Sequence, residues 1–366
     1  MSMSRALDPQ PAATADTASS VRGLPTGASP TRGIGQPMAP VFTAVAVMIL
    51  TVLAITFARS ADMVAALWGS GGVAVAVWLR TSRGPLYDLC FGGLVACGVA
   101  AGNLLAGNST STTLMFTVAN MADIYLAVLL ARRFAPTLNL ASVEGCSRFL
   151  ISAAVVAPIP AAIGVGAMLH WMNGASFMET AQTWWFGHAL SIAVISSFGL
   201  AITRRELVRF RAPARAIEAV VLLGLLAFAN VLIFGMQSLP ISFVTLPLLL
   251  LIAVRLRLLG VTAALVIISL LAIGGSMMGH GPYAVAFQGA DRATMAQLLV
   301  LFGYLPILLV AALLEERDRL ADRARAGQVR AERASAAKSR LLANVAHEIK
   351  RSEEHTSELQ SRAYLV

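Results

Sequence analysis

The chain has 366 residues, of which 57% are hydrophobic and 13% are charged, and its mean hydropathy is +0.73. A soluble globular protein carries roughly twice that charged fraction, so the excess apolar residues must face lipid. The net charge of +9 would suit nucleic-acid binding, but the arginines follow a membrane pattern and we expect no nucleic-acid partner. The cysteines Cys90, Cys97 and Cys146 form no CxxC pair and have no histidine at ligand spacing, so we expect no metal site.

Residues 1–38 are rich in Ala, Ser, Thr, Pro and Gly, a composition that predicts a disordered tail. From Pro40 onward, apolar runs of membrane-spanning length alternate with short polar breaks. These runs predict about ten spans, at 40–58, 62–79, 86–106, 112–131, 149–169, 184–202, 216–235, 239–254, 258–279 and 294–314. The second and eighth are short or interrupted by Gly and Pro, so a re-entrant or tilted segment is the alternative for either. The predicted fold class is an all-α polytopic helix bundle.

The arginines between the spans predict the topology, because cytoplasmic loops carry the excess of positive residues. Twelve arginines lie in the even-numbered breaks: Arg80, Arg83, Arg132, Arg133, Arg148, Arg204, Arg205, Arg209, Arg211, Arg215, Arg255 and Arg257. The odd-numbered breaks hold only Arg59 and Arg292. We therefore expect the N-terminus and the C-terminal helix both to lie in the cytoplasm.

The stretch from Glu315 to Lys350 is charged, rich in Ala and Arg, and has no proline and one glycine, which predicts a helix. Spacings of three and four resemble a coiled-coil seam and link Leu320, Ala324, Gly327, Ala331, Ala334, Lys338, Leu341 and Val345. We expect this signalling helix to continue from the last span into the cytoplasm. A solvated charged tail is the alternative.

The twelve residues 339–350, SRLLANVAHEIK, carry the chemistry. At 100° per residue, four apolar side chains fall on one side of a helix: Leu342, Val345, Ala346 and Ile349. His347 falls on the opposite, exposed side, and the neighbouring Glu348 can accept a proton from its ring, which makes the ring a better nucleophile. The stretch resembles the phosphoacceptor box of bacterial two-component histidine kinases, close to Phe-Leu-Ala-Asn-(Met/Val)-(Ser/Ala)-His-Glu-(Ile/Leu)-(Arg/Lys)-Thr-Pro-Leu. The resemblance implies that His347 is phosphorylated and that Glu348 is its acid/base neighbour.

The resemblance stops after Lys350, where that family continues Thr-Pro-Leu and this chain continues RSEEHTSELQS. Residues 351–361 resemble the translation of a short-read sequencing adapter, so we expect residues 351–366 to be an artefact; a natural divergent tail is the alternative. The sequence has no P-loop and no kinase glycine-rich loop. We therefore expect no cofactor in this chain, ATP and Mg²⁺ in a missing kinase domain, and no activity from the fragment alone.

The membrane region resembles the membrane-associated sensor domain, type one of the MASE families. The residues that carry this resemblance are Trp68, Gly71-Gly72, Gly102-Asn103, Asn120, Asp123, Trp184-Trp185-Phe186-Gly187, Pro247, Arg255 and Gly279-His280-Gly281-Pro282. The chain departs from the family near His188, where an acidic residue is common.

Polar groups inside a membrane are costly and therefore mark candidate sites. Asn120 and Asp123 share a helix face, and Trp184, Trp185 and His188 form a second cluster. A ligand or proton site is one hypothesis for these five residues. The alternative is that the polar groups bond a neighbouring helix and the tryptophans anchor at the membrane interface.

Together these patterns predict a tail (1–38), a transmembrane sensor domain (39–314), a signalling helix (315–338), the start of a dimerisation and phosphoacceptor domain (339–350) and an artefactual tail (351–366). We expect an inner-membrane protein in which the sensor domain controls phosphorylation of His347 within a homodimer, followed by transfer to a response regulator. A transporter or channel with a basic tail fits the ten spans equally well but does not account for the phosphoacceptor box. A diguanylate cyclase with the same sensor is a further alternative, although its connector would not carry His-Glu-Ile-Lys.

Overall fold

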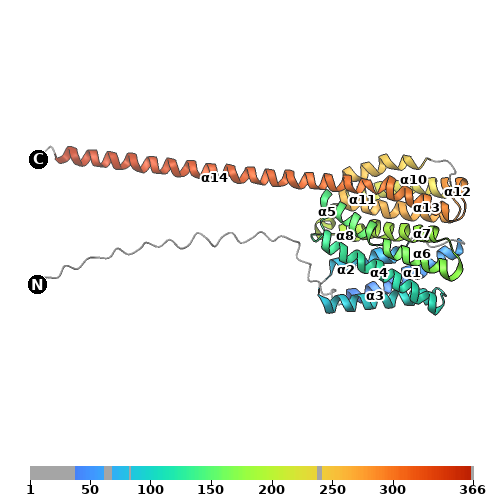
Figure 1. Ribbon diagram of the computed structural model, residues 1–366. Coiled ribbons are helices and arrows are strands. Elements are labelled where there is room, and N and C mark those ends of the chain that lie inside the picture. The colour runs from blue at the N-terminus through green and yellow to red at the C-terminus, as the bar shows by residue number, and fades with distance from the viewer. Residues whose placement is uncertain (1–37, 62–67, 82–83, 237–240, 364–366) are drawn as a thin grey trace, which may run out of the picture.

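The computed structural model describes residues 38–61, 68–81, 84–236 and 241–363, and every regular element in these ranges is helical. The predicted tail lies outside the described residues apart from Met38. A bundle of helices forms the body of the molecule, and one long helix projects from it (Figure 1).

The elements in chain order are α1 (Ala39–Ser60), α2 (Gly69–Arg80), α3 (Pro85–Leu105), α4 (Thr110–Phe134), α5 (Val143–Phe149), the π-helix η1 (Leu150–Val156), α6 (Ile159–Asn173), α7 (Phe177–Leu190), the π-helix η2 (Ser191–Ser196), α8 (Ser197–Ala201), α9 (Arg204–Arg209), α10 (Pro213–Val231), the π-helix η3 (Leu232–Met236), the 3₁₀ helix η4 (Ser242–Val244), α11 (Thr245–Met277), α12 (Pro282–Ala286), α13 (Ala290–Leu298), the π-helix η5 (Leu299–Tyr304) and α14 (Pro306–Ala363).

Local signals in the sequence set several helix starts. The hydroxyls of Ser109, Ser142 and Ser176 each accept a hydrogen bond from a backbone amide in the first turn of α4, α5 and α7. Proline occupies the first turn of α1, α3 and α10, where its missing amide hydrogen costs nothing. The Ser176 cap starts α7 at Phe177, earlier than the predicted span at 184–202.

Among the described residues, eight helical segments are long and apolar enough to cross a membrane. They are Ala39–Ser60, Pro85–Leu105, Thr110–Phe134, Val143–Asn173, Phe177–Ala201, Pro213–Met236, Ser242–Ala286 and Asp291–Glu353. Large apolar side chains such as Phe42, Leu86 and Val220 are exposed on the outside of the bundle, as a lipid-facing surface requires. The prediction of an all-α polytopic bundle is confirmed, and the chain is a multi-pass membrane protein.

The segment α11 contains both the eighth and the ninth predicted spans, because the chain reverses at Arg257. This residue has φ 59° and ψ −151°, which is not helical. Arg257 forms an ion pair of 2.8 Å with Asp318 of α14, so the reversal lies where α14 leaves the bundle. The two ends of α11 also lie close together, because Tyr283, which follows α11, forms a hydrogen bond with Ser242, which precedes it. The two halves of α11 therefore run antiparallel and make two passes.

The second predicted span, at 62–79, is described only from residue 68, where α2 supplies 12 helical residues. α2 is central and lies directly against η2. The Gly72 amide donates to the Ser191 hydroxyl at 2.9 Å, and the Ser196 hydroxyl donates to the Gly72 carbonyl at 2.9 Å. A Cβ atom at Gly72 would lie 2.5 Å from the Ser191 carbonyl oxygen, so only glycine permits this approach.

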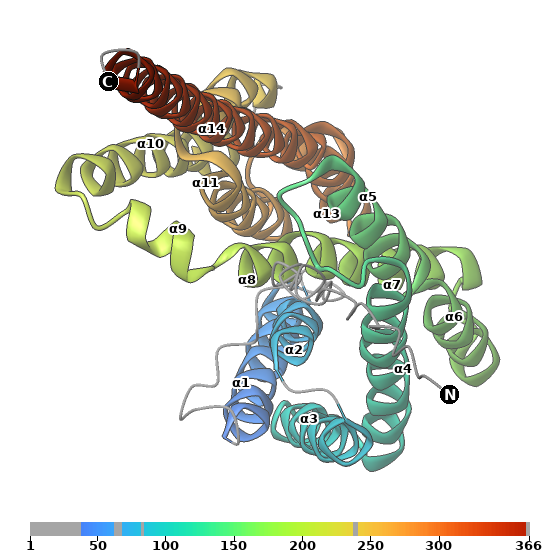
Figure 2. The ribbon, with the colours of Figure 1, turned by 90° about the vertical axis from the view of Figure 1, so that its left-hand side faces the viewer.

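The long helix α14 has 58 residues and leaves one end of the bundle, which we call the exit end (Figure 1). Seen from that end, α1–α4 lie on one side and α10, α11 and α14 on the other, with α5, α7 and α8 between them and α6 at the outer edge (Figure 2). A signal that α1–α4 detect can therefore reach α14 through these intervening helices.

Candidate functional site

Two helices bring together three of the five predicted sensing residues. Trp184 on α7 donates its indole N–H to Asp123 Oδ2 on α4 at 2.8 Å. His188, one turn further along α7, places Nδ1 2.9 Å from the same oxygen. We call Asp123, Trp184 and His188, with Trp68 and Asn120 described next, the Asp123 site.

The site is almost completely enclosed by the bundle. Asp123 is 1% exposed, Asn120 0%, His188 4% and Trp68 8%. The His188 ring stacks with Trp184 at a centroid distance of 4.4 Å and with Trp68 at 5.9 Å. The two indoles therefore cover the His188 ring where it meets Asp123.

Hydrogen bonding in the Asp123 site is incomplete. Asp123 Oδ1, Asn120 Oδ1 and Trp68 Nε1 are buried and have no hydrogen-bond partner in the described part of the chain. An unpaired polar atom in an apolar interior costs about 1–3 kcal/mol by protein mutational data, and here three such atoms belong to residues of one site. Within the described ranges, no group of three or more His, Cys, Asp or Glu side chains could hold a metal ion.

The other two predicted sensing residues bond their surroundings. Asn120 donates its amide N–H to the Phe116 carbonyl of its own helix at 2.7 Å. Its side-chain oxygen is left without a donor in the described residues. Trp185 donates its indole N–H to the Val155 carbonyl of η1 at 2.9 Å. Trp68 was predicted only as part of the family resemblance, and nothing local in the sequence indicates that it meets His188.

A second polar cluster lies at the exit end, where charged residues of α14 meet those of neighbouring elements. Glu315 is 1% exposed and accepts hydrogen bonds from Arg209 of α9 at 3.2 and 3.4 Å. Arg209 also pairs with Glu206 at 3.2 Å, and Arg319 lies 3.7 Å from Glu315. Burial is the main cause that raises the pKa of Glu206, and the nearby Glu315 carboxylate adds to it. Burial alone would lower the pKa of Arg209, but the two carboxylates together raise it.

Three further contacts complete this ring, which we call the collar. Glu316 accepts the backbone amide of Val143 at 3.0 Å, at the start of α5. Arg319 donates to Asn139 Oδ1 at 3.1 Å, and Asp318 pairs with Arg257 at the reversal of α11. The collar therefore joins residues 315–319 of α14 to α9, to the α4–α5 connection and to α11.

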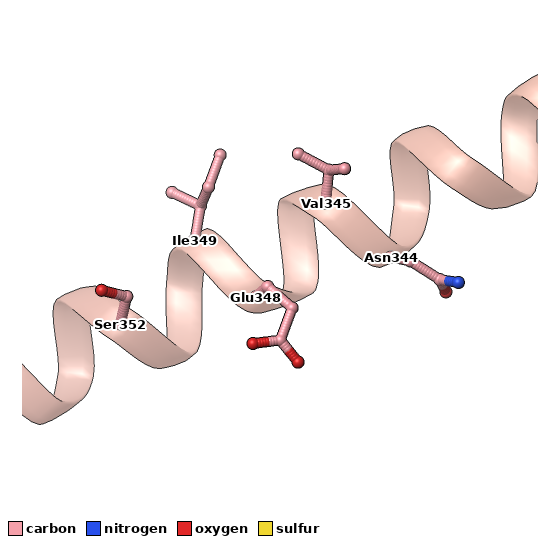
Figure 3. A pocket seen from close by; sticks show the side chains of 5 residues that line it. All are labelled: Asn344, Val345, Glu348, Ile349 and Ser352. Carbon is pink, nitrogen blue, oxygen red and sulfur yellow. The ribbon is translucent and has the colours of Figure 1, made fainter.

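The candidate phosphoacceptor residues lie far along α14, where His347 and Glu348 are both exposed. Figure 3 shows Val345 and Ile349 pointing to one side of the helix and Glu348 pointing away from them. The apolar side chains of this stretch, Leu341, Leu342, Val345 and Ile349, are all exposed in this single chain. The helix therefore exposes both an apolar face and the candidate histidine, and among the described residues no reacting group lies against His347.

Comparison with known proteins supports the sensor resemblance. The family model for MASE1 matches residues 37–318, which covers the whole bundle and ends inside the collar. Searches of the curated proteins and of the solved structures give no match. With this match and a polytopic helical bundle to fit it, the chain belongs to the MASE1 family of membrane sensor domains found in signalling proteins.

Proposed function

We propose that the chain is the membrane sensor and signalling helix of a two-component histidine kinase. The sensor domain controls ATP-dependent phosphorylation of His347, and a response regulator then takes the phosphoryl group. The observation that carries this proposal is the continuity of α14, which is one helix from the collar past the phosphoacceptor box. The twelve-residue resemblance at 339–350 supplies the chemistry, and the MASE1 match supplies the sensory role.

The collar and α14 suit transmission of a mechanical signal. At 1.5 Å per residue, the 32 residues from Glu315 to His347 span about 48 Å. Two ion pairs and one hydrogen bond hold residues 315–319 against three different elements, so a shift of any one of these elements moves the base of α14. A continuous helix carries that shift or rotation to the phosphoacceptor box without needing a contact in between.

The remaining parts of the proposal follow from charge and exposed apolar surface. Arginines of the basic breaks, such as Arg209 and Arg257, meet α14 at the exit end. In this proposal the exit end and both termini face the cytoplasm, as the positive-inside rule favours, and the membrane is a bacterial inner membrane. The exposed apolar face around Val345 is covered by a second copy of the chain in a homodimer. ATP and Mg²⁺ are held by an ATP-binding domain outside residues 1–366.

In the phosphorylation step, a ring nitrogen of His347 attacks the γ-phosphorus of ATP and ADP leaves. Glu348 accepts the proton from the other ring nitrogen and keeps the attacking nitrogen nucleophilic. An exposed His347 allows a mobile nucleotide domain, and then a response regulator, to approach it.

The test uses the product of the genomic locus, sequenced independently across codon 350 and placed in nanodiscs. With labelled ATP and Mg²⁺ we expect an acid-labile, base-stable phosphoryl group that is absent in His347→Gln. The control His280→Gln should keep the label, because His280 is exposed and lies outside the phosphoacceptor box of α14. Labelling that survives His347→Gln contradicts the assignment. A product that makes a cyclic dinucleotide from GTP would identify the cyclase alternative and leave the sensor role intact.

A further inference from the structure

The Asp123 site contains two ionisable groups where a structural contact needs none. Asp123 lies near the middle of α4, and an ionisable side chain at that depth is costly. Neutral groups join helices elsewhere in the bundle, as where the Gly72 amide of α2 donates to the Ser191 hydroxyl of η2 at 2.9 Å. The carboxylate–imidazole pair therefore calls for a reason beyond holding α4 against α7.

The hydrogen bonds of Asp123 are unevenly shared between its two oxygens. Trp184 and His188 both approach Oδ2, and Oδ1 is buried without a partner in the described residues. Asn120 lies three residues earlier on the same helix, where side chains are neighbours, and its buried Oδ1 also lacks a donor. A proton on Asp123 Oδ1 would create the donor that this stretch of α4 lacks.

The surroundings of His188 favour the same ligand. Trp68 and Trp184 stack on its ring, and aromatic rings at such distances can accommodate a cation. The pair then holds one proton as carboxylate and imidazolium, or two as carboxylic acid and imidazolium. The enclosure of Asn120, Asp123 and His188, each less than 5% exposed, suits a ligand that needs no volume.

We infer that Asp123, His188 and Asn120 form a proton-binding site at the centre of the sensor domain, with Trp68 and Trp184 as its aromatic walls. Binding adds a proton to Asp123 Oδ1, neutralises the carboxylate and weakens its ion pair with His188, which loosens α4 from α7. Since α7 packs against α13, and α13 leads through η5 into α14, the change has a route to the collar. This inference rests on the MASE1 sensor role and is independent of the kinase output.

Other charged or titratable groups lie on the elements that pack against α4 and α7. They are Arg80 on α2; Tyr87, Asp88, Cys90 and Cys97 on α3; Tyr125, Arg132 and Arg133 on α4; Glu144, Cys146 and Arg148 on α5; His170 on α6; Glu179 on α7; and Asp291 and Arg292 on α13. Asp88 is paired with Arg132 at 2.7 Å and Glu144 with Arg148 at 2.6 Å. In the described ranges, His188 is the one residue that forms an ion pair with Asp123.

The experiment reads the site through its own tryptophans. The full chain in nanodiscs of zwitterionic lipid is titrated from about pH 3 to 9, which brackets the ranges where carboxyl and imidazole groups ordinarily change charge, and tryptophan emission is recorded. We expect a pH-dependent change in emission, because Trp68 and Trp184 stack on His188. Asp123→Asn and His188→Gln should each lose most of this amplitude.

A matched control and a second readout guard against misfolding. Trp185→Phe removes an indole that bonds Val155 instead of Asp123, so it should keep most of the amplitude. The second readout is the apparent melting temperature, whose dependence on pH should be the same in Trp185→Phe as in the wild type. In Asp123→Asn that dependence should be reduced.

Three outcomes would overturn the inference. The first is a wild type whose emission does not respond to pH, and the second is a response that persists in both Asp123→Asn and His188→Gln. The third is an emission change that is lost when choline replaces Na⁺ and K⁺ at constant pH. The last would identify a metal cation as the ligand. None of these readouts involves phosphorylation, so failure here and failure of the kinase assignment remain distinguishable.

Discussion

Replacing Glu315 by alanine should loosen the base of α14. The Glu315 carboxylate is 1% exposed and accepts two contacts from Arg209, at 3.2 and 3.4 Å, while Arg319 lies 3.7 Å away. The substitution removes the acidic partner and leaves both guanidinium groups in place. The collar then keeps the α5 and α11 contacts but loses its tie to α9.

The cost can be bounded from the exposure of the partners. Removing one member of a fully buried ion pair costs about 3–5 kcal/mol. The Arg209 and Arg319 side chains are 36% and 30% exposed, so water can solvate them, and Arg209 retains Glu206. We therefore expect a loss of about 2 kcal/mol, comparable to a hydrogen bond that involves charged groups. A loss of this size corresponds to a drop of about 4–8 °C in melting temperature.

Thermal unfolding in nanodiscs, followed by intrinsic fluorescence, measures this loss. The matched control is Asp322→Ala on the same helix, because Asp322 pairs with Arg325 at 3.4 Å but both side chains are well exposed, at 64% and 79%. An exposed pair contributes about 0–1 kcal/mol, so the control should change the melting temperature little. Equal shifts for Glu315→Ala and Asp322→Ala would refute the reasoning, since burial in the collar would then contribute nothing.

Two further substitutions test helix packing and pH dependence. Gly98→Ala should destabilise the bundle by about 1–3 kcal/mol, because the added Cβ would meet the backbone carbonyl of Ala44. The control is Gly93→Ala on the same helix, where nothing lies within 4 Å of the added Cβ. An equal loss of stability for the two variants in thermal unfolding would contradict the close-packing argument. Burial raises the pKa of Glu206 above its ordinary value, so its charged form opposes folding at neutral pH and this penalty disappears as pH falls through the raised value. Glu206→Gln should therefore raise the melting temperature at pH 8, and the gain should fade toward pH 5; a gain that grows in acid would show that the sign is wrong.

Much of the fold could be predicted because the bilayer constrains each span separately. An apolar run of spanning length is recognisable without knowledge of its neighbours, so the spans that became α1, α3, α4 and α10 were visible in the sequence. The alternation of arginine-rich breaks also predicts two separate passes where α11 runs from Thr245 to Met277, with non-helical backbone at Arg257. The phosphoacceptor resemblance is likewise local, since it depends on twelve consecutive residues, and the role of His347 stays a prediction.

The contacts that define the sites are a different matter, because they depend on how helices pack. Asp123 and His188 were candidates by residue type and depth, but only the tertiary structure joined them, across 65 residues, and added Trp68. Trp184 and Trp185 are adjacent in sequence, yet successive residues of a helix point in directions about 100° apart, so one reached Asp123 and the other reached Val155. Glu315 looked like the first residue of a solvated helix, and only the placement of α9 over it made it a buried charge. The sequence alone determined which segments enter the membrane, because hydropathy is a property of each segment; the tertiary structure decided which polar groups meet inside it, because that depends on the rotation and approach of whole helices.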